Sequence, residues 1–307
     1  MDDNRQKLSG VFAPITTPFT SDEEVDLEAL AFNLSRLRRT NLTGFLALGS
    51  SGEAESLSDE ERLLVLKVFA DQRGDKVVIV GTGCESTWET IEKSHIAAQM
   101  GFDYVSVLTP GYFARYMDAP ALLRHYERIA EEVSVPVLMY NAPQFAGGVQ
   151  IPEATVVELS HQLNIAGIAD ASQTGPARFM AHLDPEEDFA VLAGSINFFY
   201  ASLHIGAEGG LLSLANIVPN RCAELYDLFM QGNYDRAKEL SNGLVRLNQV
   251  ISGTWGLGGV KTAMDLIGLK GGRPREPLMP TTVEAEALIR QALINEGFPI
   301  APSEAGV

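Results

Sequence analysis

The sequence predicts an α/β protein built as a (β/α)8 TIM barrel with a C-terminal helical extension. Three observations predict this fold class. Eight short segments rich in apolar and β-branched residues recur within residues 11–216, stretches of helical length separate them, and only helical patterns follow residue 218. A doubly wound sheet is the rival, but the residues after its first strand would carry a Gly-rich nucleotide loop, and "APITTPF" is not such a loop.

The predicted strands mostly end in Gly, Ser, Thr, Asn or Pro, as a strand that passes into a loop should. They cover residues 11–19, 44–50, 77–83, 104–110, 136–143, 165–172, 189–195 and 209–216.

The clearest predicted helix covers residues 58–74. Ser58 and Glu61 have the spacing of a capping box, and Gly74 is a stop signal. An apolar stripe is expected to begin at Leu63, Leu64 and Leu66.

We expect residues 1–218 to form the barrel, residues 219–300 a helical extension packed on it, and residues 301–307 a loose tail. The extension is predicted to contain helices within residues 220–251, 258–269 and 281–297. The glycines of "GAEGG" (206–210) indicate a helix end and turn before the last strand rather than a phosphate loop.

Charge and composition exclude several classes of function. The formal net charge is −17, which disfavours binding to nucleic acids and anionic membranes but leaves room for a small anionic substrate in a local pocket. The two cysteines make a disulfide framework implausible. No apolar run resembles a membrane span or a signal peptide, so we expect a cytoplasmic protein.

Candidate site residues stand where predicted strands end, because barrel enzymes build their active sites there. "GSSGE" (49–53) follows the second strand, and its hydroxyls and backbone N–H groups could receive a carboxylate; the alternative is a plain loop. Tyr112 and Tyr140 follow the fourth strand and end the fifth. A phenol can relay protons when a hydroxyl chain supports it, and the alternative is an aromatic plug in the barrel mouth.

Metal and cofactor chemistry find little support. The five histidines have no HxH or HExxH spacing, and there is no GxSxG elbow or P-loop. We therefore expect no metal ion and no cofactor. The histidines are His95, His125, His161, His182 and His204.

The chain resembles the dihydrodipicolinate synthase / N-acetylneuraminate lyase family of Schiff-base aldolases over nearly its whole length. The motifs "APITTPF", "GSSGE", "LSDEER", "TPGYF", "VPVLMYNAP", "LAGS" and "KTAMDLIGLKGG" occur in the family's order. The resemblance implies a (β/α)8 lyase that acts on pyruvate or another 2-oxo acid. It also implies a homotetramer.

The resemblance also implies residue roles. Ser50 and Ser51 match the pair that holds the carboxylate of the 2-oxo acid, and Tyr140 matches the general acid/base. Tyr112 matches the tyrosine that reaches into the neighbouring subunit and completes a relay with Ser50.

The family's nucleophilic lysine is missing. Ala169 occupies its place, and the chain has no lysine between Lys93 and Lys238. Lys261 matches a different family position, which we interpret as structural. Because only an amine can form the iminium that serves as the electron sink, we expect the chain as written to be inactive or to trap its substrate.

Two explanations of Ala169 stay open: a deliberate substitution that captures a bound substrate, or a natural member that lost its lysine. A 2-keto-3-deoxy-acid dehydratase on the same site is an alternative activity. A non-catalytic 2-oxo-acid-binding protein is an alternative of another class.

Two further comparisons with branches of the family disfavour two classes of substrate. Gln144 and Phe145 follow Pro143 where dihydrodipicolinate synthases keep an arginine, and Ser195 begins a segment without the acidic pair of sialic-acid lyases. The branch that the chain resembles most contains 4-hydroxy-2-oxoglutarate and 2-keto-3-deoxy-sugar-acid aldolases. This resemblance rests on "GTGCESTWET", "RHYERIA" and "LAGSINFFYASLHIGAEGG". The residues expected to line the substrate pocket are Phe145, Ala171, Gly194 and Ser195, besides the two serines.

Overall fold

Eight parallel strands close into a barrel in chain order, in a computed structural model that describes residues 3–301. Each strand pairs with its neighbours in sequence, and β1 pairs with β8. The predicted fold class, a (β/α)8 barrel followed by C-terminal helices, is confirmed. The strands are β1 (Gly10–Pro14), β2 (Gly44–Ala47), β3 (Val77–Gly81), β4 (Tyr104–Leu108), β5 (Val137–Asn141), β6 (Ile165–Asp170), β7 (Ala190–Ala193) and β8 (Gly209–Leu211).

These segments form strands because both of their faces are covered, as is usual in a parallel barrel. Every residue of β1, β2, β6, β7 and β8 is buried. Side chains from several strands, among them Phe12, Leu138 and Leu192, pack into one apolar cluster. The barrel is therefore filled by side chains and is not a pore.

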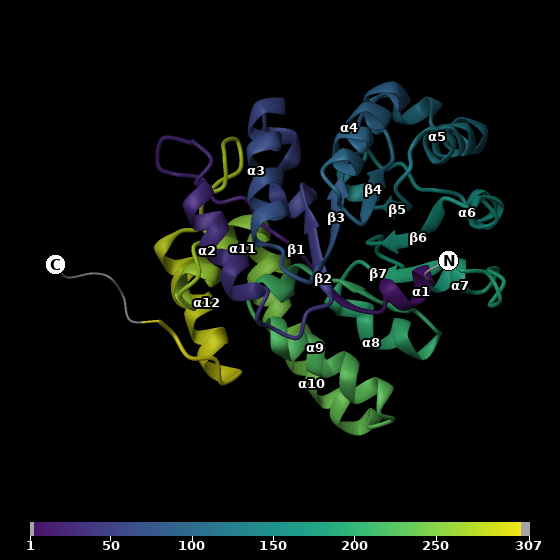
Figure 1. Cartoon of the computed structure of the whole chain (residues 1–307). Helices are drawn as coiled ribbons and strands as arrows, with labels where there is room; N and C mark the ends of the chain where they lie inside the picture. Colours follow the sequence, from purple (N-terminus) through teal and green to yellow (C-terminus); the bar gives the residue numbers. More distant parts are fainter. Residues whose placement is uncertain (1–2, 302–307) are drawn as a thin grey trace. The chain divides into compact units, whose positions relative to one another are not determined.

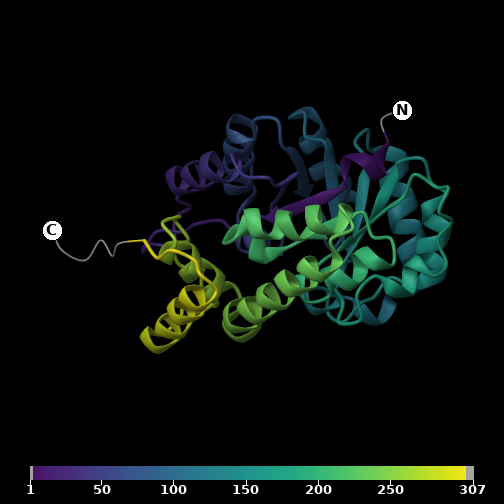
Figure 2. The ribbon, with the colours of Figure 1, turned by 90° about the horizontal axis from the view of Figure 1, so that it is seen from below.

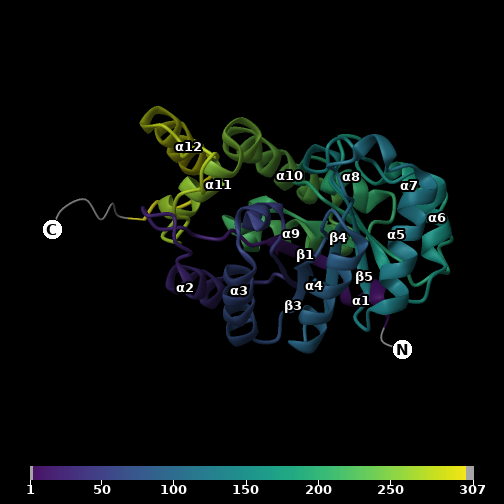
Figure 3. The same ribbon diagram turned by 90° about the horizontal axis from the view of Figure 1, so that it is seen from above.

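The chain forms two compact units, each described here by itself. The first extends to Phe12 and includes Thr43–Ala47 and Val77–Leu211, and so contains most of the barrel. Its helices lie outside the strands in Figures 1 and 3. They are α1 (Asn4–Lys7), α4 (Thr87–Gln99), α5 (Ala119–Glu132), α6 (Glu153–Ser160), α7 (Ala177–Met180) and α8 (Ile196–His204), with short 3-10 turns η3 (Ala114–Tyr116) and η4 (Pro143–Phe145).

The second unit contains Ala13–Leu42, Leu48–Lys76 and the chain from Leu212 onward. Its green helices, α9 and α10, pack against each other and stand out in Figure 2. Its elements are α2 (Leu27–Leu37), η1 (Ser50–Gly52), η2 (Ala54–Ser56), α3 (Asp59–Gln72), η5 (Ser213–Asn216), α9 (Pro219–Met230), α10 (Tyr234–Asn248), the π-helical turn η6 (Gln249–Gly253), α11 (Thr254–Leu266) and α12 (Val283–Asn295).

Helix α3 begins as predicted but buries only part of the predicted apolar stripe. The Ser58 hydroxyl accepts from the Glu61 N–H, and the Glu61 carboxylate accepts from the Ser58 N–H, which completes the capping box. The predicted apolar stripe is right for Leu66, which is buried, and wrong for Leu63 and Leu64, which are 38% and 41% exposed. Val65 and Phe69 complete the buried face of the helix.

Other local predictions fall close to the observed elements, but residues 213–216, predicted as part of the last strand, form η5. Gly206 has φ of +100° between α8 and β8, so a turn precedes the last strand as predicted, and the last two glycines of "GAEGG" belong to β8. The boundary between residues 218 and 219 stays a prediction, and residues 302–307 of the predicted tail lie outside the described residues. Within the described part of the chain, no helix is long and apolar enough to cross a membrane.

Candidate active site

The ends of β5 and β6 bring two predicted site residues together. Tyr140 and Ala169 are register partners in the two parallel strands. Ala169 is fully buried in the apolar cluster of the barrel, and the half-buried Tyr140 packs against the same cluster. Because side chains alternate along a strand, their neighbours Asn141 and Asp170 face the other way.

Position 169 offers no nucleophile. Its methyl group belongs to a cluster that includes Leu138, Ala190 and Leu192, which are all buried. The chain carries no lysine between Lys93 and Lys238, so none of the strands β4 to β8 supplies an amine in its place. An iminium cannot form at this position in the chain as written.

Behind Ala169 lies a buried polar network that fixes the ends of β5 and β6. Asp170 is fully buried, and its Oδ1 accepts from Asn141 Nδ2 at 2.7 Å and from the Ser172 N–H at 3.0 Å. Its Oδ2 accepts from Ser172 Oγ at 3.0 Å. Asn141 Oδ1 in turn accepts from the Ile151 N–H at 2.9 Å. These bonds satisfy a carboxylate that would otherwise be costly to bury.

The loop after β4 presents Tyr112 on its surface. Tyr112 is 81% exposed, and its ring stands edge-on to Phe113 with centroids 4.9 Å apart. The Glu85 carboxylate holds the loop, because it accepts from the N–H groups of Gly111 and Tyr112, the latter at 2.8 Å. The backbone under Tyr112 is thus anchored while its side chain stays exposed.

The residues predicted to line the pocket occupy three positions. Gly194 follows β7 beside Ala171, and a Cβ at Gly194 would lie only 2.6 Å from the Ala171 Cβ. Ser195 is the N-cap of α8, and its hydroxyl accepts from the Asn197 N–H. Phe145 ends η4 and is 55% exposed. Ser195 therefore caps α8, and the close approach of Ala171 leaves no room for a side chain at Gly194.

Ser50 and Ser51 lie in the second unit, at the start of η1, and are half-buried. Leu48 and Glu53 bracket the loop with left-handed φ values of +54° and +52°. Two strained residues that are not glycine, so close together, indicate a loop whose surroundings force its conformation. The grouping of these serines with Tyr140 stays a prediction.

Lys261, on α11, is fully buried, and its Nζ donates to the Thr17 carbonyl at 2.7 Å and to the Arg273 carbonyl at 2.8 Å. It also lies 2.5 Å from Glu53 Oε1. Burial lowers the pKa of Lys261, and the charge of Glu53 opposes that shift. With its amine engaged and its side chain only 1% exposed, Lys261 is not a relocated nucleophile.

No group of three or more His, Cys, Asp or Glu side chains gathers to hold a metal ion among residues 3–301. His125, for example, lies buried on α5, and the neighbour of its Nδ1 is a hydroxyl, Thr87 Oγ1, at 2.8 Å. Burial lowers its pKa to about 4.

Comparison of the sequence with known proteins identifies the family of this chain. A model of the dihydrodipicolinate synthetase family matches residues 7–295. The chain belongs to the dihydrodipicolinate synthetase family. This confirms the family that the sequence motifs indicated.

Individual members of the dihydrodipicolinate synthetase family match along almost their whole length. A 4-hydroxy-tetrahydrodipicolinate synthase of Methanothrix thermoacetophila is 34% identical, over 92% of this chain and 95% of the relative. A probable mitochondrial 4-hydroxy-2-oxoglutarate aldolase of Emericella nidulans is 32% identical, over 94% and 95%. The two identities, 34% and 32%, are too close to decide whether this chain is more similar to the synthases or to the aldolases.

A solved member of the same family has the same fold. The chloride-inhibited dihydrodipicolinate synthase of Acinetobacter baumannii, crystallised with pyruvate, aligns with a TM-score of 0.87 and 29% identity, over 95% of this chain and all of that one.

Three polar residues of this family member were not singled out as candidates from its sequence. Glu53 ends "GSSGE", Asp170 follows the lysine position, and Glu85 stands in "GTGCEST". Their positions within "GSSGE", within "GTGCEST" and directly after Ala169 were the available signal. Their partners are distant in sequence, so the pattern alone did not reveal what their carboxylates hold.

Proposed function

We propose that this chain carries the site of a Schiff-base lyase for 2-oxo acids from which the nucleophilic amine is missing. The observation that carries the proposal is the pairing of Tyr140 with Ala169 at the ends of β5 and β6. The pair offers an acid/base phenol directly beside the position where the family resemblance expects the lysine. Family membership and the names of the relatives support a lyase that releases or condenses pyruvate.

In the proposed mechanism, Ser50 and Ser51 bind the substrate carboxylate and Tyr140 moves protons beside the 2-oxo carbon. The serines follow β2 in the chain, and the loops after barrel strands build the active sites of this fold. The exposed side chain of Tyr112 supports its role in a neighbouring subunit's site, and hence a homotetramer. Without a lysine at position 169, the chain binds a 2-oxo acid and does not turn it over.

We propose the 4-hydroxy-2-oxoglutarate or 2-keto-3-deoxy-sugar-acid aldolase branch as the substrate class. Gln144 and Phe145, which follow Pro143, are both uncharged, so neither supplies a cation for a second carboxylate. Gln144 donates its Nε2 to the Ala171 carbonyl at 3.1 Å. The exposed Phe145 beside it suits a compact, partly apolar aldehyde portion. A cytoplasmic location remains a prediction from the composition.

The second candidate is a non-catalytic binder of 2-oxo acids, and Ala169 itself favours it. Such a protein retains the carboxylate-binding serines and has no use for the amine.

Borohydride trapping with pyruvate, read by intact mass, tests the proposal on the unchanged chain, on Ala169→Lys and on Leu163→Lys. Leu163 is 94% exposed and precedes β6, outside the predicted pocket residues, so its lysine variant is the control. We expect the reduced pyruvyl adduct on Ala169→Lys alone. If no variant gains the adduct although pyruvate binds, the binder is the better assignment; adducts on both lysine variants would mean that trapping is not specific to the site.

A further inference from the structure

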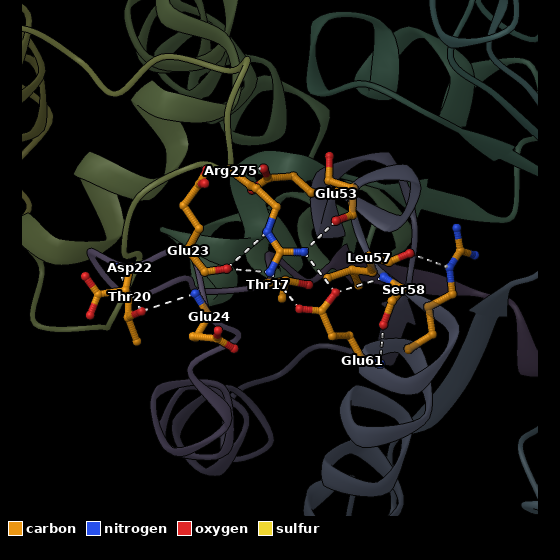
Figure 4. Close-up of polar contacts among 12 residues, drawn as sticks. Thr17, Thr20, Asp22, Glu23, Glu24, Glu53, Leu57, Ser58, Glu61 and Arg275 are labelled. Atoms are coloured by element: carbon orange, nitrogen blue, oxygen red, sulfur yellow. Dashed lines mark hydrogen bonds and ion pairs between the residues drawn. The ribbon is translucent and has the colours of Figure 1, made fainter.

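The loop that carries Ser50 and Ser51 ends at a buried carboxylate. The Glu53 side chain is 1% exposed, and its Oε1 lies 2.5 Å from Lys261 Nζ. Its Oε2 accepts from the Arg275 N–H at 2.8 Å. Figure 4 shows Glu53 at the edge of a polar cluster that also contains Arg275 and Glu61.

Lys261 holds the Glu53 carboxylate through an ion pair. Its ammonium donates to the carbonyls of Thr17 and Arg273 and lies 4.7 Å from the centre of the Phe19 ring. The amine is thus enclosed by an anion, two carbonyls and an aromatic face. A buried pair with this many partners is held in one geometry, and the loss of either charge leaves the other uncompensated.

A second contact holds the loop at the residue before Glu53. Thr17 Oγ1 donates to the Gly52 carbonyl at 2.7 Å, and the Thr17 carbonyl accepts from Lys261. Thr17 therefore links the lysine to the loop through its side chain and its backbone. Together these contacts account for the left-handed backbone of Glu53, which an unrestrained glutamate would rarely adopt.

Arg275 closes the cluster on its outer side. Its guanidinium donates to both carboxylate oxygens of Glu61, at 2.6 and 2.9 Å, and to the carbonyls of Ser56 and Glu23 (Figure 4). Its backbone N–H holds Glu53, so one residue connects the loop to the first turn of α3. The loop is clamped at its C-terminal end by groups from three separate segments.

We propose that the buried Lys261–Glu53 pair is a positioning device that sets the Ser50–Ser51 backbone and hydroxyls for the substrate carboxylate. The proposal rests on the proposed function of the two serines. The side chains of Lys261 and Glu53 are each only 1% exposed, so they act through the five-residue turn from Gly49 to Glu53. Preorganised donors bind an anion more tightly than donors that must first be ordered.

The test compares Glu53→Gln with Glu208→Gln, a matched control. Glu208 is also a largely buried carboxylate, with an ion pair to Arg5 at 2.7 Å and a hydrogen bond from the Val191 N–H. It precedes the strand β8, whereas Glu53 follows the strand β2. Both variants should lower the unfolding temperature. In calorimetric titration with pyruvate, Glu53→Gln should weaken binding by about tenfold or more, whereas Glu208→Gln should change it by less than about twofold.

A double variant separates positioning from stability. Glu53→Gln combined with Lys261→Met leaves no lone buried charge, so its unfolding temperature should recover relative to Glu53→Gln alone. Its pyruvate affinity should stay weak, and hydrogen exchange should be faster in a peptide that covers residues 48–57. Recovery of affinity together with stability would overturn the proposal.

Ser51→Ala distinguishes this proposal from the proposed function. If Ser51→Ala loses pyruvate affinity and Glu53→Gln does not, the serines bind substrate but the ion pair does not position them. If the unchanged chain binds no pyruvate, the proposed function fails, and hydrogen exchange decides alone: unchanged exchange of residues 48–57 in Glu53→Gln rejects the positioning role.

Discussion

Tyr140 and Ala169 lie opposite each other in adjoining parallel strands, at the end of β5 and β6 and against the same apolar cluster. Their side chains share one face of the barrel wall, whereas the buried Asn141–Asp170 hydrogen bond ties the other face. A lysine at position 169 would thus start beside a phenol, on a backbone that a polar network holds in place.

The first prediction concerns Tyr140 as a proton carrier. In the Ala169→Lys background, Tyr140→Phe should slow deuterium exchange at the pyruvate methyl group by roughly 100-fold or more, because the phenol is expected to move protons beside the iminium. Proton NMR in D2O measures this rate. Tyr126→Phe is the control, since the buried Tyr126 donates to the Val107 carbonyl and should affect stability only. Equal slowing in both variants would count against a role for Tyr140.

The second prediction concerns the carboxylate behind Ala169. Asp170→Ala should lower the free energy of unfolding by roughly 2–4 kcal/mol, because it leaves the buried donors of Asn141 and Ser172 without an acceptor. Urea unfolding measures the change. Asp188→Ala is the control: Asp188 also accepts three hydrogen bonds, but it is exposed, so we expect less than about 1 kcal/mol. Similar losses in both variants would contradict the argument from burial.

The third prediction is a pH dependence that arises from His125. Burial lowers its pKa to about 4 from 6.5, so between these values the unfolded chain binds a proton that the folded chain does not. This contribution is fully present above pH 6.5 and is lost as the pH falls towards 4, for a total of about 3 kcal/mol.

Urea unfolding at pH 7 and pH 4.5 tests it. His125→Asn should flatten the dependence, while the control His161→Asn, at a side chain that is 56% exposed, should keep it. An unchanged slope in His125→Asn would show that carboxylates alone cause the acid sensitivity.

The fourth prediction concerns Gly194. Gly194→Ala should destabilise the fold by roughly 1–3 kcal/mol, because the added Cβ would meet Ala171 Cβ at 2.6 Å and the Ala171 backbone N at 2.8 Å. Gly253→Ala is the control, since its Cβ would have no atom closer than 3.6 Å and its backbone is helical. That variant should be neutral or more stable by up to about 1 kcal/mol. Thermal unfolding compares the two.

Sequence patterns predicted a structural feature well where its physical cause lies within a few neighbouring residues. The capping box of Ser58 and Glu61 spans three residues, and the turn at Gly206 needs only a positive φ. The predicted apolar stripe of α3 was right for Leu66 and wrong for Leu63 and Leu64, because the packing partners decide which apolar side chains are covered. No short window of sequence contains those partners.

The sequence by itself determined the alternation of strands and helices, the family motifs and the absence of a lysine at position 169, because each can be read within a few residues. Only the tertiary structure decided that Tyr140 stands opposite Ala169, that Asp170 is held by Asn141, and that Lys261 pairs with Glu53. Strand register and buried ion pairs depend on groups that are far apart in the chain, and their free energy exists only once the core excludes water around them.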